Sequence, residues 1–346
     1  MKKVAIYGAT GYTGFELIRL LLSHPRAKIA VLSSEQYADQ PADRAFAPYK
    51  GRLGKATFGK MERLLDAAVD AAFLALPHTV SSSVVPGLLD RGVAVVDLSA
   101  DFRFRSIPLY ESVYKAAHRS PELSARAVYG LPEVHREALR KTRLAAVPGC
   151  FPTSVILALY PLLKDGLVDR KGIVADCKTG VSGGGRGPSL GFHYPEVEGG
   201  VRPYGLPGHR HNPEMDQELS LAAGEKVAVT FVPHLMPMVR GILATCYAVL
   251  KPKATAREAE AAYRAHYGTE PFVRLCPPGV LPSTKDVRGS NFCDIAVRVD
   301  ERSRRVIVAS AIDNLVKGAS GAAVQCFNLM MGFPEDDGLR AAPVFP

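Results

Sequence analysis

The chain lacks the usual marks of a membrane, secreted or metal-binding protein. Its 346 residues contain no apolar run near the roughly 20 residues that cross a bilayer. Met1-Lys2-Lys3 leads straight into a short strand pattern rather than into a signal-peptide core. The six cysteines form no Cys-x-x-Cys pair and no metal-type spacing. We therefore expect reduced thiols, no bound metal and a cytoplasmic location.

Concentrated positive charge is also lacking, although the chain is basic. Lys and Arg total 43 against 34 Asp and Glu, a formal net charge of +9. No basic run of five or more and no zinc-finger spacing occurs, which argues against nucleic acid as a partner. An anionic substrate and cofactor account for part of the excess. The length, with 47% hydrophobic residues, suffices for two domains that each bury a core.

A glycine-rich turn lies between the first predicted strand and the first predicted helix. Residues 3–7 form a short strand pattern that is apolar from Val4 on, residues 8–14 follow the pattern G-x-x-G-x-x-G, and residues 15–22 have helical periodicity. Backbone amides in such a turn approach a pyrophosphate, and the helix N-terminus stabilises its charge. We predict a dinucleotide site here, although glycines that only shape a turn give the same pattern. The expected contacts are Gly8, Thr10, Gly11, Tyr12, Thr13 and Gly14.

The residues after the second predicted strand, 28–32, bear on the choice of cofactor. Ser33 and Ser34 offer hydroxyl donors that suit a 2′-phosphate. Glu35 is of the type that usually binds a free 2′-hydroxyl and repels phosphate. We expect NADP, with Ser33 and Ser34 as contacts, and Glu35 leaves NAD open.

Strands and helices alternate through the first half of the chain. Strands predicted at 71–76 and 93–98, with helical segments between, indicate a parallel sheet with crossover helices. The second of these strands runs into Arg103, which is a candidate for an anionic group because strand ends face the ligand in such sheets. A salt bridge to Asp97 or Asp101 explains this arginine equally well.

Cys150 is the candidate nucleophile. It lies in Val147-Pro148-Gly149-Cys150-Phe151-Pro152-Thr153, directly ahead of an apolar helical pattern at 154–163. Unpaired amides and the dipole at a helix N-terminus stabilise a thiolate, and proline suits a first helical turn. A buried cysteine that only packs is the usual alternative. The neighbouring glycine and prolines keep other side chains off the sulfur, so we favour a reactive thiol.

Two further segments supply polar groups. A strand predicted at 172–177 runs into the glycine-rich stretch 178–188, whose accessible backbone suits a nicotinamide or a phosphate, or else a surface linker. His209 and His211 precede a predicted helix with Asn212 as N-cap. No third metal ligand follows at a suitable spacing. Acid–base chemistry is therefore preferred, with ordinary surface histidines as the alternative.

The second half is expected to contain more antiparallel strands. Residues 226–232 and 240–250 are predicted to pair with one another, and residues 292–299 and 305–312 to form a hairpin. Thr255 and Glu258 have the spacing of a capping box. A helix with small residues at its start is predicted at 314–331.

Five stretches, taken together, resemble one enzyme family. They are Gly8-Ala9-Thr10-Gly11-Tyr12-Thr13-Gly14, Asp97-Leu98-Ser99-Ala100-Asp101-Phe102-Arg103, Pro148-Gly149-Cys150-Phe151-Pro152-Thr153, Gly208-His209-Arg210-His211 and Asp313-Asn314-Leu315-Val316-Lys317-Gly318-Ala319. In this order, over nearly the whole chain, they resemble the N-acetyl-gamma-glutamyl-phosphate reductases. That family is similar in plan to aspartate-semialdehyde dehydrogenase and glyceraldehyde-3-phosphate dehydrogenase. Phe151 stands where tyrosine is common.

The resemblance implies an α/β fold. Its parts are an N-terminal Rossmann domain with a doubly wound parallel sheet, an α+β catalytic domain with a largely antiparallel sheet, and a C-terminal helix that returns to the first domain. We expect residues 1–148 and 314–346 to form the dinucleotide-binding domain. Residues 149–313 should form the catalytic and oligomerisation domain, and a homodimer or homotetramer is the implied assembly.

The resemblance also implies a mechanism. The Cys150 thiolate attacks the acyl phosphate of N-acetyl-glutamyl 5-phosphate, phosphate leaves, and NADPH reduces the thioester to the semialdehyde. His209 is the general acid and base. Further implied contacts are Ser182, Gly183 and Asn314 for the cofactor, and Arg103, Ser182, Arg186 and Arg240 for the substrate.

Three other functions remain open. A related reductase of lysine biosynthesis acts on an aminoadipyl phosphate held on a carrier protein, but its cysteine neighbourhood differs. A cysteine–histidine hydrolase uses the same pair without a cofactor and leaves the glycine turn unexplained. A cofactor-sensing binding protein needs no reactive thiol, so the replacement Cys150→Ser would leave its properties intact.

Overall fold

The computed structural model describes residues 1–345, and the chain divides into two compact units. The first consists of residues 1–148 and 319–340, and the second of residues 149–318 with the segment after Arg340. Residues 314–318 and 341–345, which we expected in the first domain, thus belong to the second unit. The reason is hydrogen bonding: Gly241 N donates to Asn314 Oδ1 at 2.8 Å, and Val344 N donates to Arg288 O at 2.8 Å.

The first unit contains a parallel six-stranded sheet with the order β2-β1-β3-β4-β6-β5. Its central strands are wholly buried and, apart from Asp97, apolar, as expected of a sheet covered on both faces. The strands are β1 (Lys2–Tyr7), β2 (Ala27–Leu32), β3 (Ala71–Leu74), β4 (Ala94–Asp97), β5 (Val128–Tyr129) and β6 (Leu144–Ala146). The helical segments are α1 (Tyr12–Leu22), α2 (Ala42–Ala45), η1 (Ala47–Tyr49), α3 (Met61–Leu64), α4 (Ser81–Asp90), α5 (Ile107–Tyr114), α6 (Pro121–Ser124), α7 (Pro132–Leu139) and α12 (Gly321–Met330).

Helices pack on opposite faces of this sheet, which confirms the doubly wound arrangement. Val85 of α4 joins the core cluster with Ala72 and Leu74 of β3. Phe73, which points to the other face, meets Phe327 of α12 with ring centroids 5.4 Å apart. The last helix of the chain therefore returns to the first unit, as expected. It begins at Gly321, because Val316–Ser320 forms a separate π-helical segment, η5.

The second unit contains a mixed seven-stranded sheet with the order β11-β12-β13-β10-β7-β9-β8. β7 pairs in parallel with β9, and β11 with β12, whereas the other neighbouring strands are antiparallel. The strands are β7 (Ile173–Gly180), β8 (Arg202–Pro203), β9 (Val229–Met236), β10 (Ile242–Val249), β11 (Val273–Leu275), β12 (Cys293–Asp300) and β13 (Arg305–Ile312). The helical segments are α8 (Cys150–Lys164), η2 (Val181–Gly184), η3 (Leu190–Phe192), α9 (Tyr194–Val197), α10 (Asn212–Ala223), α11 (Ala256–Tyr267), η4 (Thr284–Val287) and η5.

The pairing predicted for residues 226–232 and 240–250 is wrong, whereas the hairpin of β12 and β13 is confirmed. β7 lies between β9 and β10 and bonds to both. Nearness in sequence favoured a hairpin, but the alternating buried residues of β7 fit between the two strands. The capping box of Thr255 and Glu258 is present at the start of α11.

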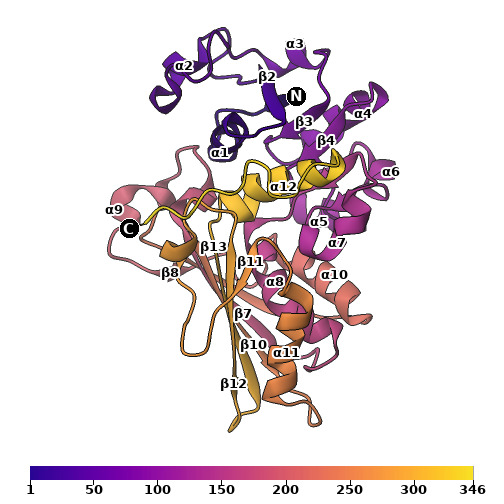
Figure 1. Cartoon of the computed structure of the whole chain (residues 1–346), viewed down its shortest axis with the longest axis vertical. Helices are drawn as coiled ribbons and strands as arrows, with labels where there is room; N and C mark the ends of the chain where they lie inside the picture. The colour runs from indigo at the N-terminus through magenta and orange to yellow at the C-terminus, as the bar shows by residue number, and fades with distance from the viewer. Residues whose placement is uncertain (346) are drawn as a thin grey trace. The chain divides into compact units, whose positions relative to one another are not determined.

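Helices α8, α10 and α11 lie along one side of this sheet (Figure 1). Side chains on the other side are half-buried, as the alternating patterns of β7 and β10 show. α8 is buried over almost its whole surface and contains Pro161. This proline has no N–H for the carbonyl of Leu157, four residues earlier. The Tyr267 hydroxyl donates to that carbonyl at 2.8 Å and satisfies it.

Candidate active site

The turn of residues 8–14 has a backbone that requires glycine at two positions. Gly8 has φ +80°, and a Cβ there would lie 2.3 Å from Ala75 O. A Cβ at Gly14 would lie 2.4 Å from Gly8 O. Gly11 is the N-cap of α1, and no side chain caps this helix. The amides of the first turn are therefore available to a ligand. This cradle fits a pyrophosphate group.

Hydroxyl groups line the start of the turn. Gly8 N donates to Ser33 Oγ at 3.0 Å, and Thr10 Oγ1 lies 2.9 Å from Ser34 Oγ. Glu35 is exposed and accepts a hydrogen bond from Met61 N at 3.1 Å. The glutamate thus caps the start of α3.

Arg103 is buried and braces the backbone of the first unit. Its Nε donates to Val147 O at 2.7 Å, and its Nη2 donates to Leu98 O at 2.9 Å. Asp101 accepts from Thr79 N and from the Tyr110 hydroxyl, at 2.7 and 2.9 Å. These contacts hold the segments that follow β4 and β6. A role for Arg103 in binding an anion stays a prediction.

Cys150 is the first residue of α8, where the sequence predicted a helix start. Its N-cap is Gly149, in an extended conformation and without a side-chain cap. The thiol is not fully buried. It lines a cavity of about 400 Å³ with Phe151, Tyr204, His209, Arg210 and His211. The structure therefore brings the two predicted catalytic residues, Cys150 and His209, to one cavity of the second unit.

The imidazole of His209 is enclosed by aromatic rings. Phe231, Tyr204 and Phe151 lie with ring centroids 5.4, 5.7 and 5.9 Å from it. Burial, and then the charge of Arg210, lower the pKa of His209 to about 4. The ring is therefore neutral at pH 7. His211 N donates to its Nδ1 at 3.1 Å, which leaves the proton on Nε2. His209 is thus an uncharged hydrogen-bond donor at pH 7, whereas the sequence suggested a group that titrates near that pH.

The residues after His209 differ from the prediction in one respect. His211, not Asn212, is the N-cap of α10. Asn212 Nδ2 donates instead to Val229 O, on the strand that follows the helix, at 2.9 Å. Sequence reasoning assigned no role to Glu214, which is fully buried and accepts from Gly149 N at 2.8 Å. Only its place in the first turn of α10, one turn after the histidines, hinted at it.

The remaining predicted residues fall into two groups. Asn314 Nδ2 donates to Ser182 Oγ at 3.0 Å, and the neighbouring Gly183 lines the cavity of Cys150. Arg240 forms a two-pronged ion pair with the wholly buried Asp313 and lines a different cavity. Arg186 is exposed in the loop after η2. The structure thus links Ser182 to Asn314 but does not bring Arg240 to the cysteine cavity.

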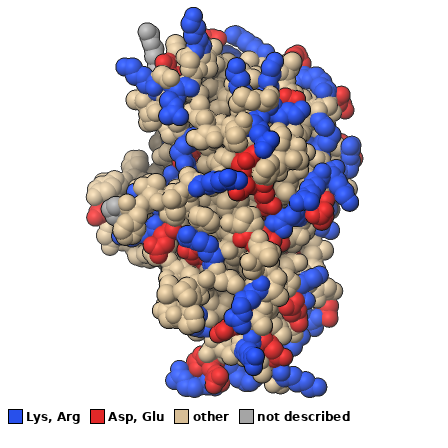
Figure 2. Space-filling model, viewed as in Figure 1, with Lys and Arg blue, Asp and Glu red and all other residues tan. Residues whose placement is uncertain are grey.

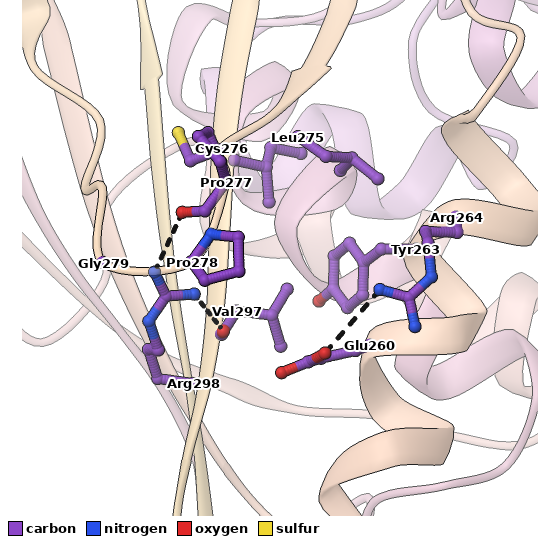
Figure 3. A pocket seen from close by; sticks show the side chains of 11 residues that line it. Glu260, Tyr263, Arg264, Leu275, Cys276, Pro277, Pro278, Gly279, Val297 and Arg298 are labelled. Carbon is purple, nitrogen blue, oxygen red and sulfur yellow. Dashed lines mark hydrogen bonds and ion pairs between the residues drawn. The ribbon is translucent and has the colours of Figure 1, made fainter.

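A second cavity of the same unit, of about 450 Å³, lies between α11 and strands β11 and β12 (Figure 3). Its cationic groups already have partners. Arg298 donates to Val297 O at 2.7 Å and to Pro277 O at 3.5 Å. Arg264 lies 3.6 Å from the carboxylate of Glu260. We therefore place the candidate active site in the cavity of Cys150.

Figure 2 shows Lys and Arg spread over the visible face and interleaved with Asp and Glu, in line with their dispersal in the sequence. Among residues 1–345, no three His, Cys, Asp or Glu side chains gather as a metal site. All six cysteines are free thiols. Within the same residues, every helix is too short or too polar to cross a bilayer.

Comparisons with known proteins agree with the geometry. Residues 3–142 match the NAD binding domain of semialdehyde dehydrogenases, and residues 150–314 match their dimerisation domain. An aspartate semialdehyde dehydrogenase II from Vibrio cholerae has the same fold, with a TM-score of 0.72 at 19% identity over 96% of this chain and 98% of that one. A Candida albicans aspartate semialdehyde dehydrogenase, solved with NADP, gives a TM-score of 0.66 at 16% identity over 96% of this chain and 98% of that one.

Full-length relatives are more specific. The N-acetyl-gamma-glutamyl-phosphate reductase of Geobacter sulfurreducens is 51% identical over 100% of both chains. That of Symbiobacterium thermophilum is 48% identical over 99% of both. These matches support the reductase reading and not the lysine-pathway, hydrolase or sensor alternatives. The chain belongs to the N-acetyl-gamma-glutamyl-phosphate reductase family.

Proposed function

We propose that this protein reduces N-acetyl-L-glutamyl 5-phosphate to N-acetyl-L-glutamate 5-semialdehyde and phosphate, with NADPH, in arginine biosynthesis. One observation carries the proposal: Cys150 begins α8 and shares a cavity with the neutral His209. About half of the residues are identical to those of reductases with this name over the full chain.

The first step uses the thiolate of Cys150. Its sulfur forms a bond to the acyl carbon, the bond from that carbon to the phosphate oxygen breaks, and phosphate leaves with the electron pair. The product is a thioester on Cys150. When bound, the reduced nicotinamide supplies the hydride for the carbon of this thioester. The bond from that carbon to sulfur then breaks, which gives the aldehyde and restores the Cys150 thiolate.

His209 stabilises the oxygen that gains negative charge in these steps. Because its Nδ1 accepts from His211 N, the proton on Nε2 is the one available for donation. A neutral imidazole donates a hydrogen bond from Nε2 to the developing oxyanion and keeps its proton, because loss of that proton would leave an imidazolate. We expect His209→Ala to lower kcat by about 10² to 10⁴.

The dinucleotide is held by the first unit in this proposal. The amides of the turn (Gly8, Thr10, Gly11, Tyr12, Thr13, Gly14) bind the pyrophosphate, and the hydroxyls of Ser33 and Ser34 bind the ribose phosphate. Glu35 does not oppose NADP if it keeps its bond to Met61 N. Ser182, Gly183 and Asn314 are proposed for the nicotinamide end, where Ser182 and Asn314 are already bonded to each other.

The substrate's carboxylate and phosphate need cationic or hydroxyl partners. Arg103, Ser182, Arg186 and Arg240 remain our candidates from the family resemblance. Arg240 binds a buried carboxylate, so its contribution to substrate binding requires that it also reach the ligand or leave Asp313. Arg186 is exposed in the loop after η2.

We also propose a homodimer or homotetramer in the cytoplasm. The matched dimerisation domain and the half-buried side of the seven-stranded sheet support self-association through the second unit. The free state of all six cysteines is in keeping with a reducing compartment.

A spectrophotometric assay tests the function. The reverse reaction, with phosphate, N-acetyl-glutamate semialdehyde and either NADP or NAD, should produce reduced nicotinamide, faster with NADP. Cys150→Ala should abolish it while cofactor affinity stays nearly unchanged, because different elements hold the thiol and the dinucleotide. Wild-type turnover in the alanine variant would refute the assignment. Faster turnover of an aminoadipyl semialdehyde would redirect it to the lysine pathway.

A further inference from the structure

The buried carboxylate of Glu214 lies where two helices begin. It belongs to the first turn of α10 and is fully buried, and its Oε1 accepts from Gly149 N at 2.8 Å. Gly149 is the N-cap of α8 and precedes Cys150. The amide of an N-cap residue has no partner within its own helix. Glu214, 65 residues away in sequence, supplies that partner and satisfies the amide.

The same short segment is fixed on other sides. A Cβ at Gly149 would lie 2.6 Å from His211 Nε2, so the imidazole packs directly on the Gly149 backbone. A Cβ at Gly318 would lie 2.9 Å from Cys150 Cβ, so η5 packs on the cysteine itself. Gly149 O accepts from Thr153 N at 3.0 Å, inside α8. Of these contacts, only the one from Glu214 is a directional bond from outside the helix to the residue beside the cysteine.

We propose that Glu214 is a positioning residue for Cys150, which it holds in place through the N–H of Gly149. The inference deepens the proposed function and rests on it where turnover is measured. The carboxylate sets the direction in which the first turn of α8 leaves the preceding loop, and this direction sets where the sulfur meets the acyl carbon. A displacement of about 1 Å at a reacting atom can cost about 10² in rate.

The bond, rather than the charge, is what positions the cysteine. The positive end of the α8 dipole stabilises the Cys150 thiolate. A negative charge on the nearby Glu214 weakens this stabilisation, so the charge of Glu214 by itself does not favour the nucleophile. Glutamine has nearly the same shape, and its Oε1 accepts from Gly149 N without a negative charge. Glu214→Gln and Glu214→Ala therefore separate the bond from the charge.

The experiment compares these two variants with Glu218→Ala. Glu218 is buried on α10 one turn later, and its Oε1 accepts from Gln217 Nε2 at 2.9 Å. For Glu214→Ala we expect kcat to fall by about 10² with little change in KM. Glu214→Gln should restore most of kcat, and Glu218→Ala should keep it. Wild-type kcat in Glu214→Ala would overturn the proposal.

Two readouts do not depend on the substrate. Hydrogen exchange of the peptide containing Gly149 should be slow in the wild type and in Glu214→Gln, and fast in Glu214→Ala. The rate of Cys150 alkylation by iodoacetamide should change by about tenfold in Glu214→Ala and stay at the wild-type value in Glu214→Gln and Glu218→Ala. Absence of turnover in the wild type would refute the proposed function and leave these two readouts to decide about Glu214. Should Glu214→Ala fail to fold, a folded Glu214→Gln protein with kcat reduced about 10² would refute the positioning role.

Discussion

His209 should make the protein less stable in acid, because burial holds its ring neutral. Burial, and then Arg210, lower the pKa of His209 from 6.5 to about 4. In the unfolded chain the imidazole takes up a proton near its ordinary pKa of about 6.5. Between these two values the unfolded state binds more protons than the folded state. Stability that is present above pH 6.5 is therefore lost as the pH falls toward 4.

The size of this effect follows from the two pKa values. Relative to pH 7.5, the linkage relation gives a loss of about 2.5 kcal/mol at pH 4.5. His209→Gln has no ring to protonate and lacks this contribution. The wild type should therefore lose about 2.5 kcal/mol more free energy of unfolding than the variant between the two pH values.

Urea unfolding at both pH values, followed by circular dichroism, measures the difference. His193→Gln, which removes an exposed imidazole from the same unit, controls for the loss of a histidine as such. Nitrogen NMR of labelled histidine should in addition show Nδ1 of His209 unprotonated and Nε2 protonated at pH 7. Equal losses in the wild type and in His209→Gln would refute the reasoning, because the ring would then titrate alike in both states.

Three other replacements test separate parts of the structure. Tyr267→Phe leaves Leu157 O, already without a helical partner, unsatisfied, and should cost about 1–3 kcal/mol in urea unfolding; an unchanged midpoint would contradict this. Gly149→Ala drives a methyl group into His211 and should lower the free energy of unfolding by about 1–3 kcal/mol and also lower kcat. Wild-type stability and kcat in this variant would contradict the prediction. Glu35→Ser should leave the ratio of kcat/KM for NADPH and NADH unchanged if the carboxylate stays on Met61 N, whereas a gain for NADPH would place it at the ribose.

The sequence alone predicted the features that depend on neighbouring residues. The glycine turn at 8–14 was predictable because its backbone leaves no room for a Cβ at Gly8 or Gly14. The helix start at Cys150 was predictable from its flanking glycine and prolines, and the hairpin of β12 and β13 from its alternating apolar residues. Both patterns act over a few neighbouring positions. The family resemblance added the reaction, and the full-length relatives agree with it.

Which distant groups meet depends on the packing of whole elements and could not be predicted from the sequence. The tertiary structure placed β7 between β9 and β10, where chain order had suggested a hairpin. It enclosed His209 among aromatic rings, which changed a group expected to titrate near neutrality into a neutral donor. It also brought Glu214 to the amide beside Cys150 across 65 residues of chain. Burial and hydrogen bonding between such groups depend on how whole elements pack, and no local pattern of residues records that packing.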